Sequence, residues 1–250
     1  MNLENILNHS KTSLPERLPP SSCYVRAMFH TCICFPGAAG GVHDYRALLD
    51  ALPGHWRITA SQEREPYPSI PAMAEAYRRD IAGSPDFLGG WSMGGLIAFE
   101  VARTDPAPLM LLDVAPPLGY DHHNHSWFAA FVEMTCASLG VRVDVPKAGE
   151  LNIAVLAAYL KHAGQDAPAA LLAERWDTYQ RHAGAVADYM PESGVSAPAL
   201  LVAAELLDVQ VDQWANLLGP TESLRLDTDH VGVLSSESMR AVATKLCKGW

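Results

Sequence analysis

The stretch Leu88-Gly89-Gly90-Trp91-Ser92-Met93-Gly94-Gly95 decides how the rest of the sequence is interpreted. An apolar segment of strand type leads into it, and a helix-like segment, Leu96 to Arg103, follows directly. Gly90 and Gly94 flank Ser92 in a G-x-S-x-G pattern, which is typical of a sharp turn between a strand and a helix. Such a turn holds the serine in a strained conformation at a helix N-terminus, where free N–H groups favour negative charge. The stretch therefore predicts a serine nucleophile for acyl transfer.

Segments of strand and helix type alternate on both sides of this stretch. Strands are expected at 23–28, 31–35, 56–60, 86–89, 109–113, 199–204 and 222–226, and helices at 42–52, 69–83 and 235–247. Such alternation predicts an α/β fold with a mostly parallel central sheet flanked by helices. Ligands of such sheets bind at the carboxyl ends of the strands, where Ser92 is expected to lie.

The segment from Pro116 to about Gly194 departs from this alternation. Three helix-like stretches cover 127–139, 150–163 and 167–189, with no strand signal between them. An all-helical block of this length inside an α/β chain predicts a lid over the active site. The expected organisation is a flexible N-terminal lead at 1–21, a core formed by 22–117 and 195–250, and a helical lid insertion at 118–194.

Composition narrows the class of protein. The chain has 250 residues, of which 49% are hydrophobic, which suits one α/β domain with an insertion. No apolar run reaches the ~18 residues of a membrane helix. The N-terminal residues have no continuous apolar core, so they do not have the pattern of a signal peptide. The net charge of −10 argues against a nucleic-acid partner. Of five cysteines, Cys32 and Cys34 fall on one strand face, which indicates buried thiols in a reducing cytoplasm.

A serine hydroxyl needs a base to become a nucleophile near neutral pH, and the base needs a carboxylate behind it. Among ten histidines, His230 is the best placed. It follows the last expected strand and precedes the final helix, as the chain order nucleophile, acid, histidine requires. Asp229 is too close in sequence to be its partner and is expected to shape the loop.

Two carboxylates compete to orient His230. Asp113 ends the strand that follows the nucleophile's helix, so it would project from the same rim as Ser92. Asp208 follows a later strand, where many enzymes of this architecture carry the acid, but Glu205-Leu206-Leu207 makes its register uncertain. We favour Asp113, and Asp208 remains the alternative.

Two further features bear on the site. The small-residue loop Pro36 to Gly41 is expected to supply one half of an oxyanion hole, and the N–H of Met93 the other half. His122, His123 and His125 could suggest a metal, but adjacent loop histidines rarely converge on one ion, and we interpret them as a solvated hinge of the lid. No metal is expected.

These residues resemble the thioesterase domains and proteins of nonribosomal peptide and polyketide synthases, in the α/β-hydrolase superfamily. The resemblance covers roughly 22–247 and rests on the following segments: Phe35 to Gly41, Ser69 to Ala74, Leu88 to Glu100, Leu111 to Asp113 with Pro116-Pro117, and Asp229-His230. It implies an α/β-hydrolase fold in which Ala38 and Met93 donate the oxyanion N–H groups. An acid at the position of Asp113 is typical of chain-terminating members, whereas many discrete proofreading members place it where Asp208 lies.

The resemblance also implies the reaction. Ser92 would take an acyl, peptidyl or polyketide chain from the phosphopantetheine arm of a carrier protein and release it by hydrolysis or cyclisation, with no cofactor of its own. The alternatives are a discrete (type II) enzyme that removes aberrant acyl groups, or an esterase of soluble esters. An acidic carrier protein would need a local basic patch, for which Arg78 and Arg79, or Arg64 and Arg46, are candidates.

Overall fold

The structure is a computed structural model that describes residues 30–38, 41–61, 67–117, 127–141, 152–204 and 208–249. The predicted N-terminal lead and the predicted strand at 23–28 lie outside these residues. The strands are β1 (His30–Phe35), β2 (Trp56–Ala60), β3 (Phe87–Trp91), β4 (Leu109–Leu112), β5 (Ala199–Ala203) and β6 (Thr221–Arg225). They form one sheet in the order β2-β1-β3-β4-β5-β6, and all five neighbouring pairs are parallel. The predicted parallel α/β sheet is confirmed.

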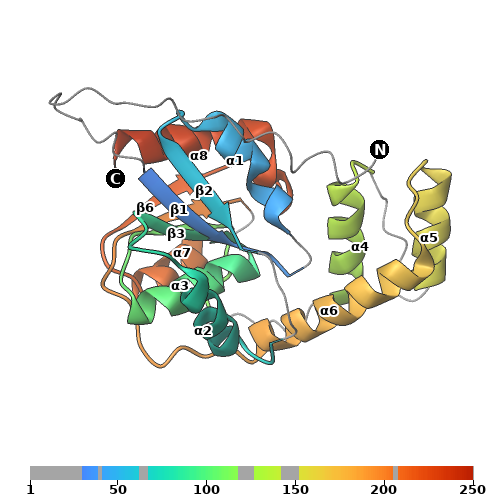
Figure 1. The fold of residues 1–250 in the computed structure, drawn as a ribbon, viewed down its shortest axis with the longest axis horizontal. Helices are drawn as coiled ribbons and strands as arrows, with labels where there is room; N and C mark the ends of the chain where they lie inside the picture. The colour runs from blue at the N-terminus through green and yellow to red at the C-terminus, as the bar shows by residue number, and fades with distance from the viewer. Residues whose placement is uncertain are drawn as a thin grey trace, which may run out of the picture.

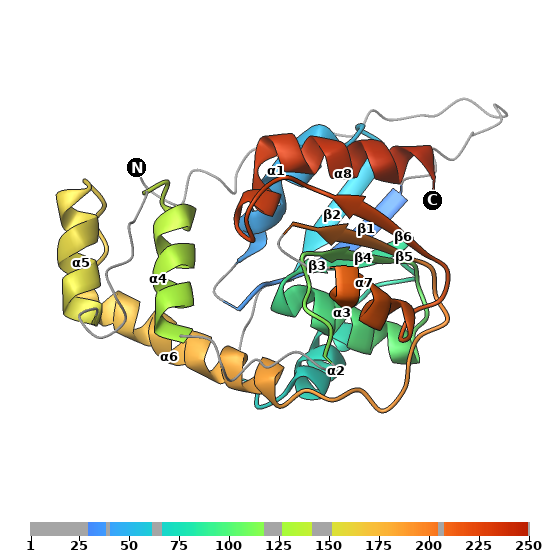
Figure 2. The ribbon, with the colours of Figure 1, turned by 180° about the vertical axis from the view of Figure 1, so that it is seen from behind.

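Helices cover both faces of the sheet (Figure 1). One face packs on α2 (Ile70–Asp80), α3 (Met93–Thr104) and α7 (Asp208–Ala215). The other face packs on α1 (Arg46–Ala51), which follows the 3-10 turn η2 (Val42–Tyr45), and on α8 (Ser236–Lys248), which follows the 3-10 turn η4 (Gly232–Leu234). Figure 2 shows α1 and α8 together above the sheet, and α2 and α3 below it.

Local sequence sets several of these boundaries. The Ser69 hydroxyl accepts from the N–H of Ala72 and caps α2, and Pro71 lies in the first turn, where its missing N–H costs no hydrogen bond. Cys32 and Cys34 are both buried on the α1/α8 face, with their sulfurs 3.7 Å apart. Trp214 is a core residue: it is fully buried, and its indole donates to the carbonyl of Val114. Its helix, α7, was not predicted as a helix from the sequence.

The three helices of the expected lid are α4 (Trp127–Ser138), α5 (Ile153–His162) and α6 (Ala169–Ala187). In Figures 1 and 2, α4 and α5 stand side by side on α6, to one side of the sheet. The prediction placed the start of α5 at residue 150. The helix begins instead at Ile153, because the Asn152 side chain accepts from the N–H groups of Ala154 and Val155 and caps it.

These helices have a small hydrophobic core of their own. Its buried members are Phe131, Val132, Cys136, Leu156, Leu160, Leu172 and Tyr179. Rings of Phe128, Phe131, Trp176 and Tyr179 contact one another with centroids 4.9 to 6.1 Å apart. Within the described ranges, no helix is both long and apolar enough to cross a bilayer.

Candidate active site

The turn between β3 and α3 is as sharp as the G-x-S-x-G pattern predicts. Ser92 caps α3 with φ 55° and ψ −126°, a strained conformation for a residue with a side chain. A β-carbon on Gly90 would lie 2.1 Å from the carbonyl carbon of Gly94, and one on Gly94 would lie 2.1 Å from the carbonyl oxygen of Phe35. Both positions therefore require glycine, because backbone atoms fill the space that a side chain would need.

Asp113 stands beside Ser92 at the carboxyl edge of the sheet. Trp91 and Leu112 are partners in the β3–β4 register, and the N–H of Ser92 donates to the carbonyl of Leu112 at 3.1 Å. Asp113 follows Leu112 with φ 48°, the only described non-glycine residue besides Ser92 with a positive φ. Its carboxylate is 3% exposed, and its Oδ1 accepts from the N–H of Ala204 at 2.8 Å. The carboxylate is therefore held in a fixed direction.

His230 meets this carboxylate. Its Nδ1 lies 2.7 Å from Oδ2 of Asp113, and its side chain is 31% exposed. Behind it, Oδ1 of Asp229 accepts from the N–H of Gly232, so Asp229 shapes the loop as expected. The loop thus brings a histidine from the far end of the chain to the edge where Ser92 stands.

Asp208, the alternative acid, is the first residue of α7. The segment 205–207 and the position of the Asp208 side chain lie outside what the structure describes. What the structure places against the imidazole is Asp113. The choice between the two carboxylates as the functional acid stays a prediction, now supported by this contact.

Trp91 ties the nucleophile turn to the histidine loop. Its indole Nε1–H donates to the carbonyl of His230 at 2.9 Å, and the two rings have centroids 4.8 Å apart. A β-carbon on Gly37 would meet the same indole at 2.7 Å, so the ring also packs under the small-residue loop. The hydrogen bond from Trp91 to a residue 139 positions away left no signal in the sequence.

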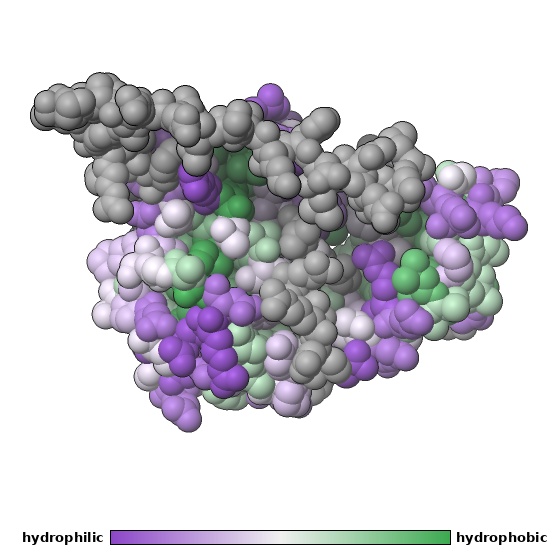
Figure 3. All heavy atoms as spheres, in the orientation of Figure 1, coloured by the Kyte–Doolittle hydropathy of each residue, from purple (hydrophilic) through white to green (hydrophobic). Residues whose placement is uncertain are grey.

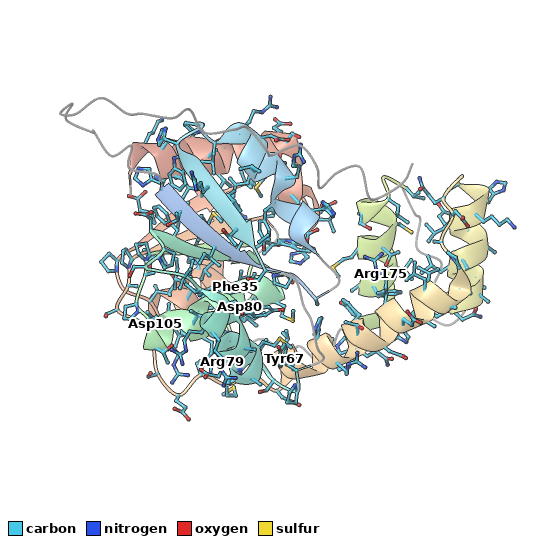
Figure 4. The ribbon with its side chains drawn as sticks, in the orientation of Figure 1. Phe35, Tyr67, Arg79, Asp80, Asp105 and Arg175 are labelled. Carbon is cyan, nitrogen blue, oxygen red and sulfur yellow. The ribbon has the colours of Figure 1, made fainter. Side chains whose placement is uncertain are left out.

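The small-residue loop leaves the end of β1 at Phe35, which Figure 4 shows at the centre of the fold. The Tyr45 hydroxyl donates to the Phe35 carbonyl and accepts from the N–H of Trp91 at 2.9 Å. Burial raises the pKa of Tyr45 well above its ordinary value, which keeps the hydroxyl protonated as a donor. This link joins the base of the loop to the base of the nucleophile turn, and sequence reasoning missed it.

The two predicted oxyanion donors lie at the ends of these elements. Met93 is the first residue of α3, so its N–H has no acceptor within the helix. Ala38 lies in the loop after β1, and its carbonyl oxygen is 2.8 Å from Nδ1 of His182 in α6. His182 is a second residue that sequence reasoning missed, because nothing in its local pattern indicates a contact with that loop.

The remaining sequence candidates are partly outside the described residues. His122, His123, His125 and Arg64 fall there. Within the described ranges, no three His, Cys, Asp or Glu side chains are grouped as metal ligands would be. Arg78 and Arg79 both pair with Glu75, and Arg46 pairs with Asp50. Figure 3 shows polar residues gathered over α2, and Figure 4 shows Arg79 there with Asp105 nearby.

A strained serine at a helix N-terminus, at the same edge of the sheet as a histidine held by a buried carboxylate, is an arrangement suited to acyl transfer. The family model described as the thioesterase domain matches residues 30–122. Over this stretch the chain is similar to thioesterase domains. This match includes the small-residue loop, Ser92 and Asp113, and it confirms the resemblance predicted from the sequence. No significant match was found among curated proteins.

Solved structures similar to this chain include three associated with natural-product synthesis. A holo four-domain nonribosomal peptide synthetase is 22% identical, with a TM-score of 0.75 over 88% of this chain; the chain spans 19% of that protein's length. RedJ, a thioesterase of the prodiginine pathway of Streptomyces coelicolor, is 19% identical, with a TM-score of 0.64 over 94% of this chain and 96% of its own. ClbQ, from the colibactin pathway, is 15% identical, with a TM-score of 0.62 over 88% and 96%. These likenesses establish the α/β-hydrolase fold.

Proposed function

We propose that this protein is a serine thioesterase that takes an acyl, peptidyl or polyketide chain from the phosphopantetheine thioester of a carrier protein. The observation that carries the proposal is the 2.7 Å contact between His230 Nδ1 and Asp113 Oδ2 at the edge where the strained Ser92 stands. The domain match and the neighbours from peptide and polyketide pathways support the choice of a thioester substrate.

In the acylation step, Asp113 accepts a hydrogen bond from Nδ1–H of His230 and so leaves Nε2 as the basic nitrogen. Nε2 takes the proton of the Ser92 hydroxyl as its oxygen attacks the thioester carbonyl. The N–H groups of Ala38 and Met93 stabilise the oxyanion that forms. The C–S bond then breaks, and the imidazolium returns its proton to the departing pantetheine sulfur.

In the release step, the same histidine activates the second nucleophile. A water, or a hydroxyl or amine of the acyl chain itself, loses a proton to Nε2 and attacks the ester on Ser92. The Ser92 oxygen leaves and regains its proton from the imidazolium. Water gives a free acid, whereas an internal nucleophile gives a ring. The chemistry uses no metal or organic cofactor beyond the pantetheine arm of the substrate.

The proposal includes a carrier protein as the binding partner and the cytoplasm as the place where the reaction occurs. Phosphopantetheine thioesters are presented by acyl or peptidyl carrier proteins, which implies a docking surface near Ser92. The exposed arginines of α2 are partly neutralised, because Arg78 and Arg79 share Glu75 and Arg78 also lies 3.6 Å from Asp105. We therefore expect apolar contact to contribute to docking alongside charge.

A single-turnover assay tests the proposal. Protein is mixed with one equivalent of an acyl-pantetheine thioester, free or on a carrier protein, and its mass is measured over time. We expect the acyl mass to appear on wild-type protein and not on Ser92→Ala. Equal turnover by Ser92→Ala would contradict the proposal.

The same assay separates the alternative functions. A discrete proofreading enzyme would hydrolyse short, aberrant acyl groups on carrier proteins faster than full-length chains. An esterase of soluble esters would process simple aryl esters well and gain nothing from the pantetheine arm. The product mass distinguishes hydrolysis from cyclisation by the 18 Da of one water.

A further inference from the structure

Helix α6 belongs to two hydrophobic cores at once. The part of the helix up to Tyr179 contributes Leu172 and Tyr179 to the small core shared with α4 and α5. Its second half contributes Ala185, and Tyr189 just beyond its end, to the core on the α2/α3 face of the sheet. The helix therefore runs continuously from the body of the fold into the insertion, as Figure 1 shows.

The second half is fixed to the body by polar contacts as well. The Tyr189 hydroxyl donates to Glu100 of α3 at 2.6 Å, and Arg103 pairs with the same carboxylate at 2.8 Å. Burial, followed by the hydrogen bond to Glu100, raises the pKa of Tyr189, so this donor stays protonated at physiological pH. One end of α6 is anchored, and the other end carries α4 and α5.

His182 lies between these two halves. Its side chain is 4% exposed, and its Nδ1 is 2.8 Å from the carbonyl oxygen of Ala38. Because a carbonyl oxygen only accepts hydrogen bonds, Nδ1 carries the proton and donates it. Ala38 packs against both hydrophobic cores. The bond thus joins the insertion, the body of the fold and the predicted oxyanion loop at one point.

The other described end of that loop is held by a different element. The N–H of Gly41 donates to Oδ2 of Asp44 in η2 at 3.1 Å. Burial raises the pKa of Asp44, and the positive charge of Arg175, on the insertion half of α6, acts in the opposite direction. Figure 4 places Arg175 where α6 passes below α4. The loop is therefore held by α6 at Ala38 and by η2 at Gly41.

We propose that His182 is a positioning residue, which couples the seating of the helical insertion to the orientation of Ala38 in the oxyanion loop. This inference rests on the proposed function, in which the N–H of Ala38 stabilises the oxyanion. A donor on the carbonyl of Ala38 fixes the peptide plane that follows this residue, and so restricts rotation about its Cα–C bond. Oxyanion donors are effective because they are oriented before the reaction begins. When the insertion is displaced, His182 moves with α6 and the loop loses this restraint.

The test compares three variants of the full-length protein with wild type. His182→Leu removes the donor, His182→Asn places an amide N–H close to the position of Nδ1, and His182→Gln carries its amide too far out to replace it. His162→Leu, at the exposed end of α5, is the matched control. For each protein, kcat and KM are measured with an acyl-pantetheine thioester as substrate. Two further measurements are the melting temperature Tm and the affinity for an alkyl boronic acid, which mimics the tetrahedral adduct on Ser92.

We expect His182→Leu and His182→Gln to lower kcat about tenfold and to weaken boronate binding by the same factor, with KM little changed. This is less than the ~10²–10³-fold loss of an oxyanion donor itself, because the Ala38 N–H remains. His182→Asn should retain most of the activity, and His162→Leu all of it. If His182→Leu does not fold, the inference is tested by comparing the kcat and the boronate affinity of His182→Asn with those of His182→Gln.

Two results would overturn the inference. One is wild-type kcat and boronate affinity in His182→Gln. The other is an equal loss in His182→Asn and His182→Gln that follows Tm, since a purely structural role would give that pattern. If wild-type protein forms neither an acyl-enzyme nor a boronate adduct, the proposed function itself fails and this inference fails with it.

Discussion

The nucleophile turn and the helical insertion are built on different packing principles. Around Ser92, backbone packs directly on backbone, so that Gly90 and Gly94 have no room for even one methyl group. In the insertion, side chains pack on side chains. Gly184, where α6 joins the body of the fold, also has open space where its β-carbon would be. The comparison teaches that the nucleophile turn is fixed by the main chain, whereas the helices α4 to α6 are held together by apolar side chains that many sequences could supply.

The largest effect is expected at the carboxylate. Asp113→Asn should lower kcat on the order of 10⁴-fold, because an amide no longer holds His230 in the tautomer that leaves Nε2 basic. The fold should persist, since asparagine can still accept from the N–H of Ala204. Asp208→Asn is the control and should change kcat little. Stopped-flow release of pantetheine thiol measures both, and the reverse ranking would assign the acid to Asp208.

The next effect concerns the stability of the turn. Gly94→Ala places a β-carbon against the Phe35 carbonyl and should destabilise the fold by about 3 kcal/mol or more, because β1 and α3 cannot both keep their positions. Denaturant unfolding measures the change in the free energy of unfolding. A Gly94→Ala protein with wild-type stability and acylation rate would contradict this account of the turn.

A smaller effect is expected at Trp91. Trp91→Phe keeps a ring against the imidazole and over Gly37 but removes the indole donor to the His230 carbonyl. One lost hydrogen bond corresponds to about 1 kcal/mol, so kcat should fall roughly five- to tenfold. Trp56→Phe, which alters a stacked pair with Phe87 in the body of the sheet, is the matched control. An identical kcat for both variants would show that the indole N–H does not hold the histidine loop.

The smallest effect has the opposite sign. Gly184→Ala in α6 should stabilise the protein by about 0.5–1 kcal/mol, because alanine costs less backbone entropy in a helix and meets no atom there. Thermal unfolding with kcat as a second readout measures it. A loss of stability would mean that α6 is packed at Gly184 as tightly as the nucleophile turn is at Gly94.

The same contrast explains what the sequence could predict. The G-x-S-x-G stretch, the alternation around it, and the order Ser92, Asp113, His230 each follow from local backbone or strand-end requirements, which leave residue types at fixed places. Helices α4 to α6 were also recognisable, since apolar periodicity marks them. The start of α5 was placed three residues early because the cap at Asn152 competes with a helix-like pattern before it.

Contacts between distant segments could not be predicted. The bonds from Tyr45 to Phe35, from Trp91 to His230 and from His182 to Ala38 each depend on how elements pack in space. In each pair, one partner is a backbone carbonyl, which any residue supplies. The domain boundaries at 118–194 stay a prediction, and α6 shows why they are hard to draw: a single helix crosses from one core to the other.

That double membership of α6 has a consequence for engineering. A chimaera that exchanges the insertion at its sequence borders would import a foreign half-helix into the body of the fold, and would separate Tyr189 from Glu100. The better crossover point lies inside α6, after Tyr179 and before His182. A segment joined there would bring its own counterparts of α4, α5 and the first part of α6. The recipient would keep the hydrogen bond from His182 to Ala38.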